Sequence, residues 1–128
     1  AEAVLLICAL LDTEEIREDL AICRFLGINA IVEAHDAAEV SSAVNAGADI
    51  IGVNNRNLKD FTVDLGNAAK LRNGAPKGTV FVAESGVSSP EDAAALRRTG
   101  ADAILVGEYL MRAADKKQAL NALREAAK

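Results

Sequence analysis

Residues 80–108 read VFVAESGVSSPEDAAALRRTGADAILVGE and carry the clearest indication of the fold. An apolar run ends in a polar Glu-Ser-Gly turn, a helix with Ser89 and Pro90 at its start follows, and a second apolar run ends in Gly-Glu. Two successive strands that end in glycine-bearing turns offer backbone N–H groups to one anion, as in the phosphate site of a β/α barrel. The stretch therefore predicts an α/β protein that binds a phosphorylated small molecule.

A short pattern recurs along the chain: a glycine, a small or apolar residue, Asn or Asp, and then a β-rich run. It begins at Gly27, Gly47 and Gly100. A glycine suits the left-handed position after a helix, and the run that follows suits a strand buried on both faces. Together with the other apolar runs, the repeat predicts five strands, at about 4–9, 29–33, 49–53, 79–83 and 102–106.

Helix start signals fall between these strands. Asp12 and Asp36 are each followed three residues later by glutamate, Ser89 precedes a proline, and Asp64 is the candidate cap of the third helix. The predicted helices cover 13–26, 37–46, 65–73, 90–99 and 109–126. Strands that alternate with helices indicate a parallel sheet. We therefore expect residues 1–128 to form a single domain of five βα units, a partial TIM (βα)8 barrel, with a flavodoxin-like five-stranded sheet as the alternative.

Composition argues against several classes of protein. The net charge of −5 does not suit a general nucleic-acid binder, which needs a basic face. The longest apolar run, residues 3–11, is too short to span a membrane and does not fit a secretory signal. Cys8 and Cys23 are expected to be reduced and buried in a cytoplasmic protein. His35 is the only histidine, so neither a metal site nor a cofactor is predicted.

Polar or glycine residues follow four of the predicted strands, and the carboxyl ends of parallel strands meet at one edge of a sheet. These residues are Glu33, Asn54, Glu84, Ser85, Gly86, Gly107 and Glu108. Glu33 and Glu84 are a candidate carboxylate pair, in which one acid holds a proton while the other is charged. Asn54 is suited to bind a substrate hydroxyl or carboxylate, and Gly86 lets a ligand approach the backbone.

Some of these residues also have plainer explanations. Glu33 is equally explained as the solvated start of a loop. Asn54 and Asn55 together are equally explained by turn chemistry. His35 is more simply explained as a hydrogen-bonding loop residue than as a catalyst.

Two charged residues belong with the predicted anion site. Arg56 lies in the longest irregular connection, residues 54–64, and is a candidate cation beside an anionic ligand. Glu108 opens the last predicted helix, so its backbone N–H, with the side chain pointing away, is expected to contact a phosphate.

Four motifs in this order resemble one enzyme family over nearly the whole chain. They are IVEAHD at 31–36, IGVNNRNL at 51–58, VAESGV at 82–87 and LVGEYLMR at 105–112. Together they closely resemble indole-3-glycerol phosphate synthase. A Gly-x-Asn-x-Arg-x-Leu loop followed by Ala-Glu-Ser-Gly is far more specific than either motif alone.

The resemblance implies a (βα)8-barrel carboxy-lyase of tryptophan biosynthesis. Such an enzyme closes the indole ring of 1-(2-carboxyphenylamino)-1-deoxyribulose 5-phosphate, with loss of carbon dioxide and water. By resemblance, Glu33 is a general base in the dehydration, Asn54 orients the substrate, and Glu84 helps to position the general acid and the ring. Residues that cradle the phosphate are, by the same resemblance, Ser85, Gly86, Gly107 and Glu108. Arg56 matches an arginine beside the substrate carboxylate.

The chain resembles only strands four to eight of that barrel, whereas a full barrel needs about 250 residues. The family's general-acid lysine on its third strand, and a lysine and a glutamate on its first, have no counterpart here. Lys59, Lys70 and Lys77 fall in predicted loops or helices. We therefore expect the isolated chain to bind a phosphorylated ligand but to turn it over little, because loss of a general acid costs about 10²–10⁴ in rate.

An open barrel also exposes two sheet edges, which invite pairing. The expected partners are the missing N-terminal barrel segment or a second copy of the chain in a homo-oligomer. Two other functions stay open: a non-catalytic phosphate-binding or structural half-barrel, and another phosphosugar barrel of the phosphoribosylanthranilate isomerase type. The loop at Asn54 argues against the last of these.

Overall fold

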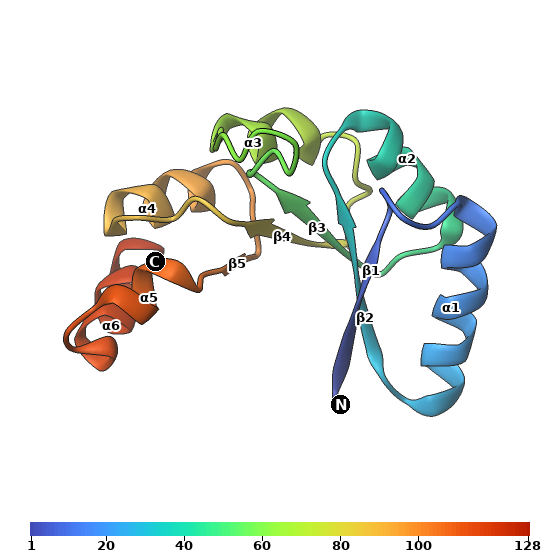
Figure 1. Ribbon diagram of the computed structural model, residues 1–128, viewed down its shortest axis with the longest axis horizontal. Coiled ribbons are helices and arrows are strands. Elements are labelled where there is room, and N and C mark those ends of the chain that lie inside the picture. The colour runs from blue at the N-terminus through green and yellow to red at the C-terminus, as the bar shows by residue number, and fades with distance from the viewer.

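Five parallel strands alternate with helices in the computed structural model, which describes residues 1–128 (Figure 1). The strands are β1 (Ala3–Ile7), β2 (Asn29–Ala34), β3 (Ile50–Asn54), β4 (Val80–Glu84) and β5 (Ala103–Leu105). The helices are α1 (Thr13–Leu26), α2 (Ala37–Ala46), α3 (Gly66–Arg72), α4 (Pro90–Arg98), α5 (Glu108–Arg112) and α6 (Lys116–Ala126). The predicted α/β class and five βα units are confirmed.

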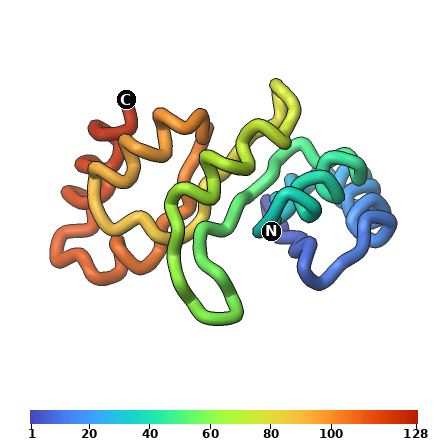
Figure 2. Tube along the Cα trace, turned by 90° about the horizontal axis from the view of Figure 1, so that it is seen from above, coloured from blue at the N-terminus to red at the C-terminus, as the bar shows by residue number.

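The strands lie in one sheet in the order β1-β2-β3-β4-β5, so each strand pairs with the next one along the chain. Figure 2 shows the units following one another across the molecule from the N-terminal to the C-terminal end. A flavodoxin-like sheet places its first strand inside the sheet. The flavodoxin-like alternative is therefore wrong, and the sheet is an open segment of a barrel, with β1 and β5 as its edges.

Predicted caps explain where three of the six helices begin. Asp12 forms a full capping box with Glu15, and the side chains of Asp36 and Ser89 accept hydrogen bonds from backbone N–H groups in the first turns of α2 and α4. Gly27 ends α1 in the left-handed conformation, with φ of 69°. Because these local signals occur at every βα junction up to β3, the sequence pattern placed those elements to within a few residues.

Two of the predicted helices, 65–73 and 109–126, differ from those in the structure. Asp64 does not cap α3: the cap position is Leu65, which makes no side-chain cap, and Asp64 instead accepts from the Gly66 N–H. The predicted helix 109–126 is two helices, because Ala113 is extended and Asp115 starts α6 by accepting from the N–H of Gln118.

The strands at the two edges are shorter than predicted. β1 ends at Ile7, where Leu10 and Leu11 both donate to the Ile7 carbonyl in a turn. β5 begins at Ala103, because the backbone and side chain of Asp102 are both bonded to Phe81 of β4.

The two faces of the sheet differ in how they are covered. Helices α1 to α4 lie along one face of the sheet (Figure 1). On that face Val32, Ile51 and Phe81 are fully buried. The register places Leu5 and Val80 on the opposite, inner face, and both are more than 40% exposed. The hydrophobic core therefore sits between sheet and helices, and the inner face leaves the apolar side chains of Leu5 and Val80 exposed.

The prediction that both cysteines are buried is correct for Cys23 and wrong for Cys8. Cys8 is half-buried, Cys23 is buried, and both are free thiols. Burial, together with the acidic Glu39, Glu33 and Asp36, raises the pKa of the Cys8 thiol to about 11, so this thiol is protonated at neutral pH. None of the helices has the length and apolarity required for a membrane span.

Candidate functional site

A buried polar cluster closes the inner face at the carboxyl ends of the three central strands. Glu33 lies near the end of β2, Asn54 ends β3 and Glu84 ends β4, and the register pairs Asn54 directly with Glu84. Their exposed fractions are 5%, 9% and 2%. The Asn54 amide donates to Glu33 Oε1 at 3.4 Å. Parallel strands thus bring together three polar side chains that are scattered in the sequence, as the strand-end pattern predicted.

The missing side chain of Gly52 makes room for the Glu84 carboxylate. A Cβ atom built on Gly52 would overlap Glu84 Oε1, and would lie 2.9 Å from Glu84 Cδ and 3.1 Å from Ile31 Cγ2. Gly52 pairs with Glu33 in the register, so all of these groups belong to the inner face. Glu84 therefore lies across the sheet surface over β3.

Gly52→Ala is expected to destabilise the chain, because the added methyl group forces the buried Glu84 carboxyl out of its place. Overpacking of this kind costs about 1–3 kcal/mol. Urea unfolding of Gly52→Ala beside the wild type measures the loss. Gly107→Ala is the control for a glycine substitution with open space, since a Cβ there meets no atom within 4 Å and φ is negative, as it is in most other residues. An unchanged midpoint in Gly52→Ala would contradict the packing described above.

Burial changes the titration of Glu84. Burial, followed by the hydrogen bond and negative charge of Glu33, raises the pKa of Glu84 to about 8. Glu84 Oε1 has no hydrogen-bond partner in the structure. Glu84 therefore keeps its proton to a higher pH than an ordinary carboxyl group does, which is the property of a carboxyl group that donates a hydrogen bond at neutral pH.

A turn with two left-handed residues follows β4 and opens a second part of the site. Ser85 has φ of 66° and Gly86 has φ of 87°. A non-glycine residue in this region is uncommon, and such strain is concentrated at functional sites. Ser85 and Gly86 line a hollow of about 1000 Å³ with Gly107 and Glu108. The predicted phosphate residues of β4 and β5 therefore do share one hollow.

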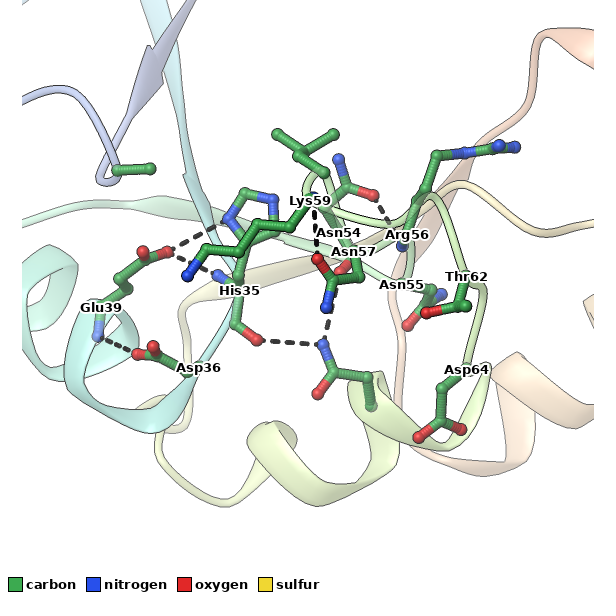
Figure 3. Close-up of a pocket in the computed structure, with 13 residues that line it drawn as sticks. His35, Asp36, Glu39, Asn54, Asn55, Arg56, Asn57, Lys59, Thr62 and Asp64 are labelled. Carbon is green, nitrogen blue, oxygen red and sulfur yellow. Dashed lines mark hydrogen bonds and ion pairs between the residues drawn. The ribbon is translucent and has the colours of Figure 1, made fainter.

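Arg56 links this hollow to a smaller one of about 480 Å³. Its guanidinium lies 3.4 Å from Glu108 Oε2, and Arg112 lies 2.8 Å from Glu108 Oε1. Asn54 and Arg56 line the smaller hollow, and the backbone N–H of Arg56 donates to Asn54 Oδ1 at 2.9 Å (Figure 3). The Glu108 carboxylate, which was expected to point away, thus lies between two arginines.

The predicted site residues do not all face one opening. Asn54 faces the smaller hollow, whereas Ser85, Gly86, Gly107 and Glu108 face the larger one, and Arg56 lines both. Glu33 and Glu84 line neither hollow, because both side chains are buried.

Two asparagines that sequence reasoning did not assign to the site hold its loop in place. The buried Asn55 accepts from the Ala68 N–H and donates to the Ser85 carbonyl, while its backbone N–H donates to the Glu84 carbonyl. Asn67 donates to the carbonyls of His35 and Asn54 (Figure 3). The signal for Asn55 in the sequence was the pair Asn54-Asn55 at the end of a strand. Asparagine side chains that form turns can also anchor a loop by hydrogen bonds to other segments.

Comparison with known proteins identifies the family. The family model of indole-3-glycerol phosphate synthase matches residues 1–123. Indole-3-glycerol phosphate synthase of Ruminiclostridium cellulolyticum is 52% identical over 127 residues, which are 99% of this chain and 49% of that protein. The enzyme of the same name from Leuconostoc mesenteroides subsp. mesenteroides is 48% identical over 97% of this chain and 47% of its own length. The chain thus spans about half the length of the curated relatives it matches.

Solved structures with lower identity share the fold. Thiamine phosphate pyrophosphorylase from Pyrococcus furiosus has a TM-score of 0.77 at 24% identity, over 99% of this chain and 59% of that chain. The BexX/CysO complex of Amycolatopsis orientalis has a TM-score of 0.71 at 24% identity, over 91% of this chain and 46% of that chain. At this identity the likeness concerns the α/β fold alone. The family match and the close relatives, however, show that this chain belongs to the indole-3-glycerol phosphate synthase family.

Proposed function

We propose that this chain provides the carboxylate-bearing and phosphate-binding half of an indole-3-glycerol phosphate synthase. The whole enzyme would close the indole ring of 1-(2-carboxyphenylamino)-1-deoxyribulose 5-phosphate in tryptophan biosynthesis, with loss of carbon dioxide and water. The observation that carries the proposal is the cluster of Glu33, Asn54 and Glu84 beside the hollow at Ser85 and Gly107. Family membership supports the same reaction.

The charges and hydrogen bonds support a task for each group in this proposal. The phosphate binds in the larger hollow, against Ser85 and the backbone N–H groups at Gly86, Gly107 and Glu108. Arg56 is placed to leave Glu108 and pair with the carboxylate of the substrate.

The two carboxyl groups have different tasks. Glu33 takes a proton in the dehydration stage, while Glu84, whose raised pKa keeps it protonated, donates a hydrogen bond that helps to position the general acid and the ring. The Asn54 amide holds Glu33 and fixes the direction of its carboxylate.

The uncovered inner face supports a further part of the proposal, that strands from outside this chain complete the barrel. Leu5, Val80 and Leu105 expose apolar side chains there, and β1 and β5 have unpaired edges. The remaining N-terminal part of the barrel is the first expected partner, and a second copy of the chain is the alternative.

A cytoplasmic location fits the two free thiols.

The test is an assay of ring closure by the chain alone and by the chain mixed with the N-terminal half of the Ruminiclostridium cellulolyticum relative. We expect turnover only from the mixture, because by resemblance the general-acid lysine belongs to the family's third strand. Full turnover by the chain alone would contradict this assignment of the general acid. Absence of turnover from a mixture that does associate would contradict the proposed reaction.

Gly86→Ala is expected to raise KM for the substrate about tenfold or more in the same mixture. A Cβ at this position would overlap Val63 Cγ1 and lie 3.1 Å from Leu65 Cδ2, and φ is 87°, so the turn and the loop above it must move. Steady-state kinetics measure the change. Gly78→Ala is a matched control, because Gly78 has φ of 94° but open space around it. Equal KM values in Gly86→Ala and wild type would contradict the assignment of this turn to the phosphate site.

A second candidate function is a half-barrel that binds phosphate or assembles without catalysis. The uncovered inner face favours it, since the acid–base cluster stands on a sheet that this chain does not close. The match to the indole-3-glycerol phosphate synthase family model, by contrast, argues against a phosphoribosylanthranilate isomerase. The substitution of Glu33 described in the Discussion separates the catalytic from the non-catalytic function.

A further inference from the structure

Helix α1 presents two apolar side chains on a flank that stays exposed. Ile22 and Leu26 are 54% and 59% exposed, and they lie on the same side of the helix because four residues make about one turn. The buried stripe of α1 consists of Ile16, Leu20 and Cys23. At about 100° per residue, the exposed pair lies roughly a quarter to a third of a turn to one side of this stripe.

The opposite flank of α1 shows what such a position contacts in this fold. Arg17 and Arg24 lie on that side of the buried stripe. Arg17 donates to the Asn45 carbonyl at 2.9 Å, and Arg24 donates to the Gly47 carbonyl at 2.6 Å, both at the end of α2. The following βα unit thus packs against one flank of α1. The apolar flank points the other way, toward the free edge of β1.

The outer face of β1 is also less covered than that of β2. The register pairs Leu6 with Val32 and Val4 with Ala30, so all four side chains point to the face on which the helices lie. Val32 and Ala30 are buried, whereas Leu6 and Val4 are only partly buried. Helix α1 is the last of the helices along this end of the sheet (Figure 1). An open apolar surface therefore runs from the flank of α1 to the outer face of β1.

Building on the proposed function, we propose that this surface is the docking site for one helix of the N-terminal half of the synthase. The α1–β1 surface consists of Ile22, Leu26, Val4 and Leu6. Its occupant is the helix of the βα unit that directly precedes β1.

The topology favours this occupant over a second copy of the chain. A right-handed connection into a parallel strand places its helix on the face already covered by α1 to α4. If a strand pairs with the free edge of β1 and leads into it, the intervening helix lies over β1 and beside α1. The relatives supply a segment of the necessary length, since the chain spans only 49% of the Ruminiclostridium cellulolyticum protein.

The surface also decides the chemistry of the occupant. A helix that packs here must present aliphatic side chains three and four residues apart, which fit between Ile22, Leu26 and the side chains of β1. Phe25 is 89% exposed but lies nearly opposite the buried stripe. It points away from both β1 and α2, so the docked helix does not reach it.

The test compares Ile22→Glu and Leu26→Glu with Phe25→Glu, the same kind of change on the outermost face of α1. All three side chains are exposed in the chain alone, so its urea midpoint should change little and equally. The N-terminal half of the Ruminiclostridium cellulolyticum relative is then titrated into each variant, and calorimetry measures association without substrate. We expect Ile22→Glu and Leu26→Glu to weaken association about tenfold or more, because each would bury an unpaired carboxylate. Phe25→Glu should stay within about twofold of the wild type.

Association of Ile22→Glu as tight as that of the wild type overturns the proposal, and so does a failure of the wild-type halves to associate. Sedimentation of the chain alone examines the other occupant. Self-association that Ile22→Glu abolishes and the N-terminal half does not displace would assign the surface to a second copy and overturn the proposal. A mixture that associates through this surface but closes no ring would contradict the proposed function and support the docking site.

Discussion

Replacing Glu33 with glutamine is expected to lower kcat of the complemented synthase by about 10²–10⁴, with little change in KM. Glutamine has the same shape, and its amide oxygen still accepts from the Asn54 amide that now bonds Glu33 Oε1. Packing on the inner face is therefore kept, and only the ability to take a proton is lost. Steady-state kinetics of ring closure by the mixed halves measure the effect.

The control for this substitution is Glu125→Gln, the same chemical change on the exposed surface of α6. It should leave both kinetic constants unchanged. Far-UV circular dichroism and urea unfolding show whether Glu33→Gln keeps the fold. A kcat within about threefold of the wild type would remove Glu33 from the proton transfer and favour the non-catalytic half-barrel.

Replacing Glu84 with glutamine is expected to stabilise the chain above pH 8. The pKa of Glu84 is about 8 in the folded state against an ordinary value of 4.5, because the carboxyl is buried beside Glu33. Between these two values the unfolded state binds fewer protons than the folded state, so the free energy of unfolding falls as pH rises. The full shift corresponds to at most about 5 kcal/mol. Glutamine cannot ionise and so removes this loss.

Urea unfolding from about pH 3 to pH 9 measures the difference, because this range extends beyond both the ordinary and the raised pKa of Glu84. Wild type and Glu84→Gln should show similar slopes of stability with pH below about pH 4.5, diverge as pH rises, and differ most above pH 8. The same change at the exposed Glu91 serves as the control for the removal of one negative charge. Parallel curves for Glu84→Gln and wild type across this range would contradict the raised pKa of Glu84.

Much of the fold follows from signals that lie close together in the sequence. Gly27 and Gly47 end their helices in the left-handed conformation, and Asp12 and Asp36 cap the helices that they precede. The elements that these residues bound were predicted to within a few residues. The split between α5 and α6 was missed, because Ala113-Ala114-Asp115 contains neither glycine nor proline and the stop depends on how α6 packs against α4.

The candidate site was predictable to the extent that strand ends place it. Glu33, Asn54 and Glu84 meet because they end neighbouring parallel strands, and that inference needs only the strand positions. The division into two hollows was not predictable, because it depends on the loop at Arg56 lying over the sheet. The position of His35 between Glu33 and Glu39 was also missed, since it exists only once α2 has brought Glu39 back to the end of β2.

The strand order has a consequence for how the chain is made. Every strand pairs with its immediate successor, so no pairing has to wait for a distant segment. Each pairing closes only the loop of one βα unit, about 20–30 residues, so its cost in chain entropy is modest. We expect each βα unit to dock on the one before it while the ribosome is still extending the polypeptide. The nascent chain would then lengthen its sheet one strand at a time, always with a single growing end.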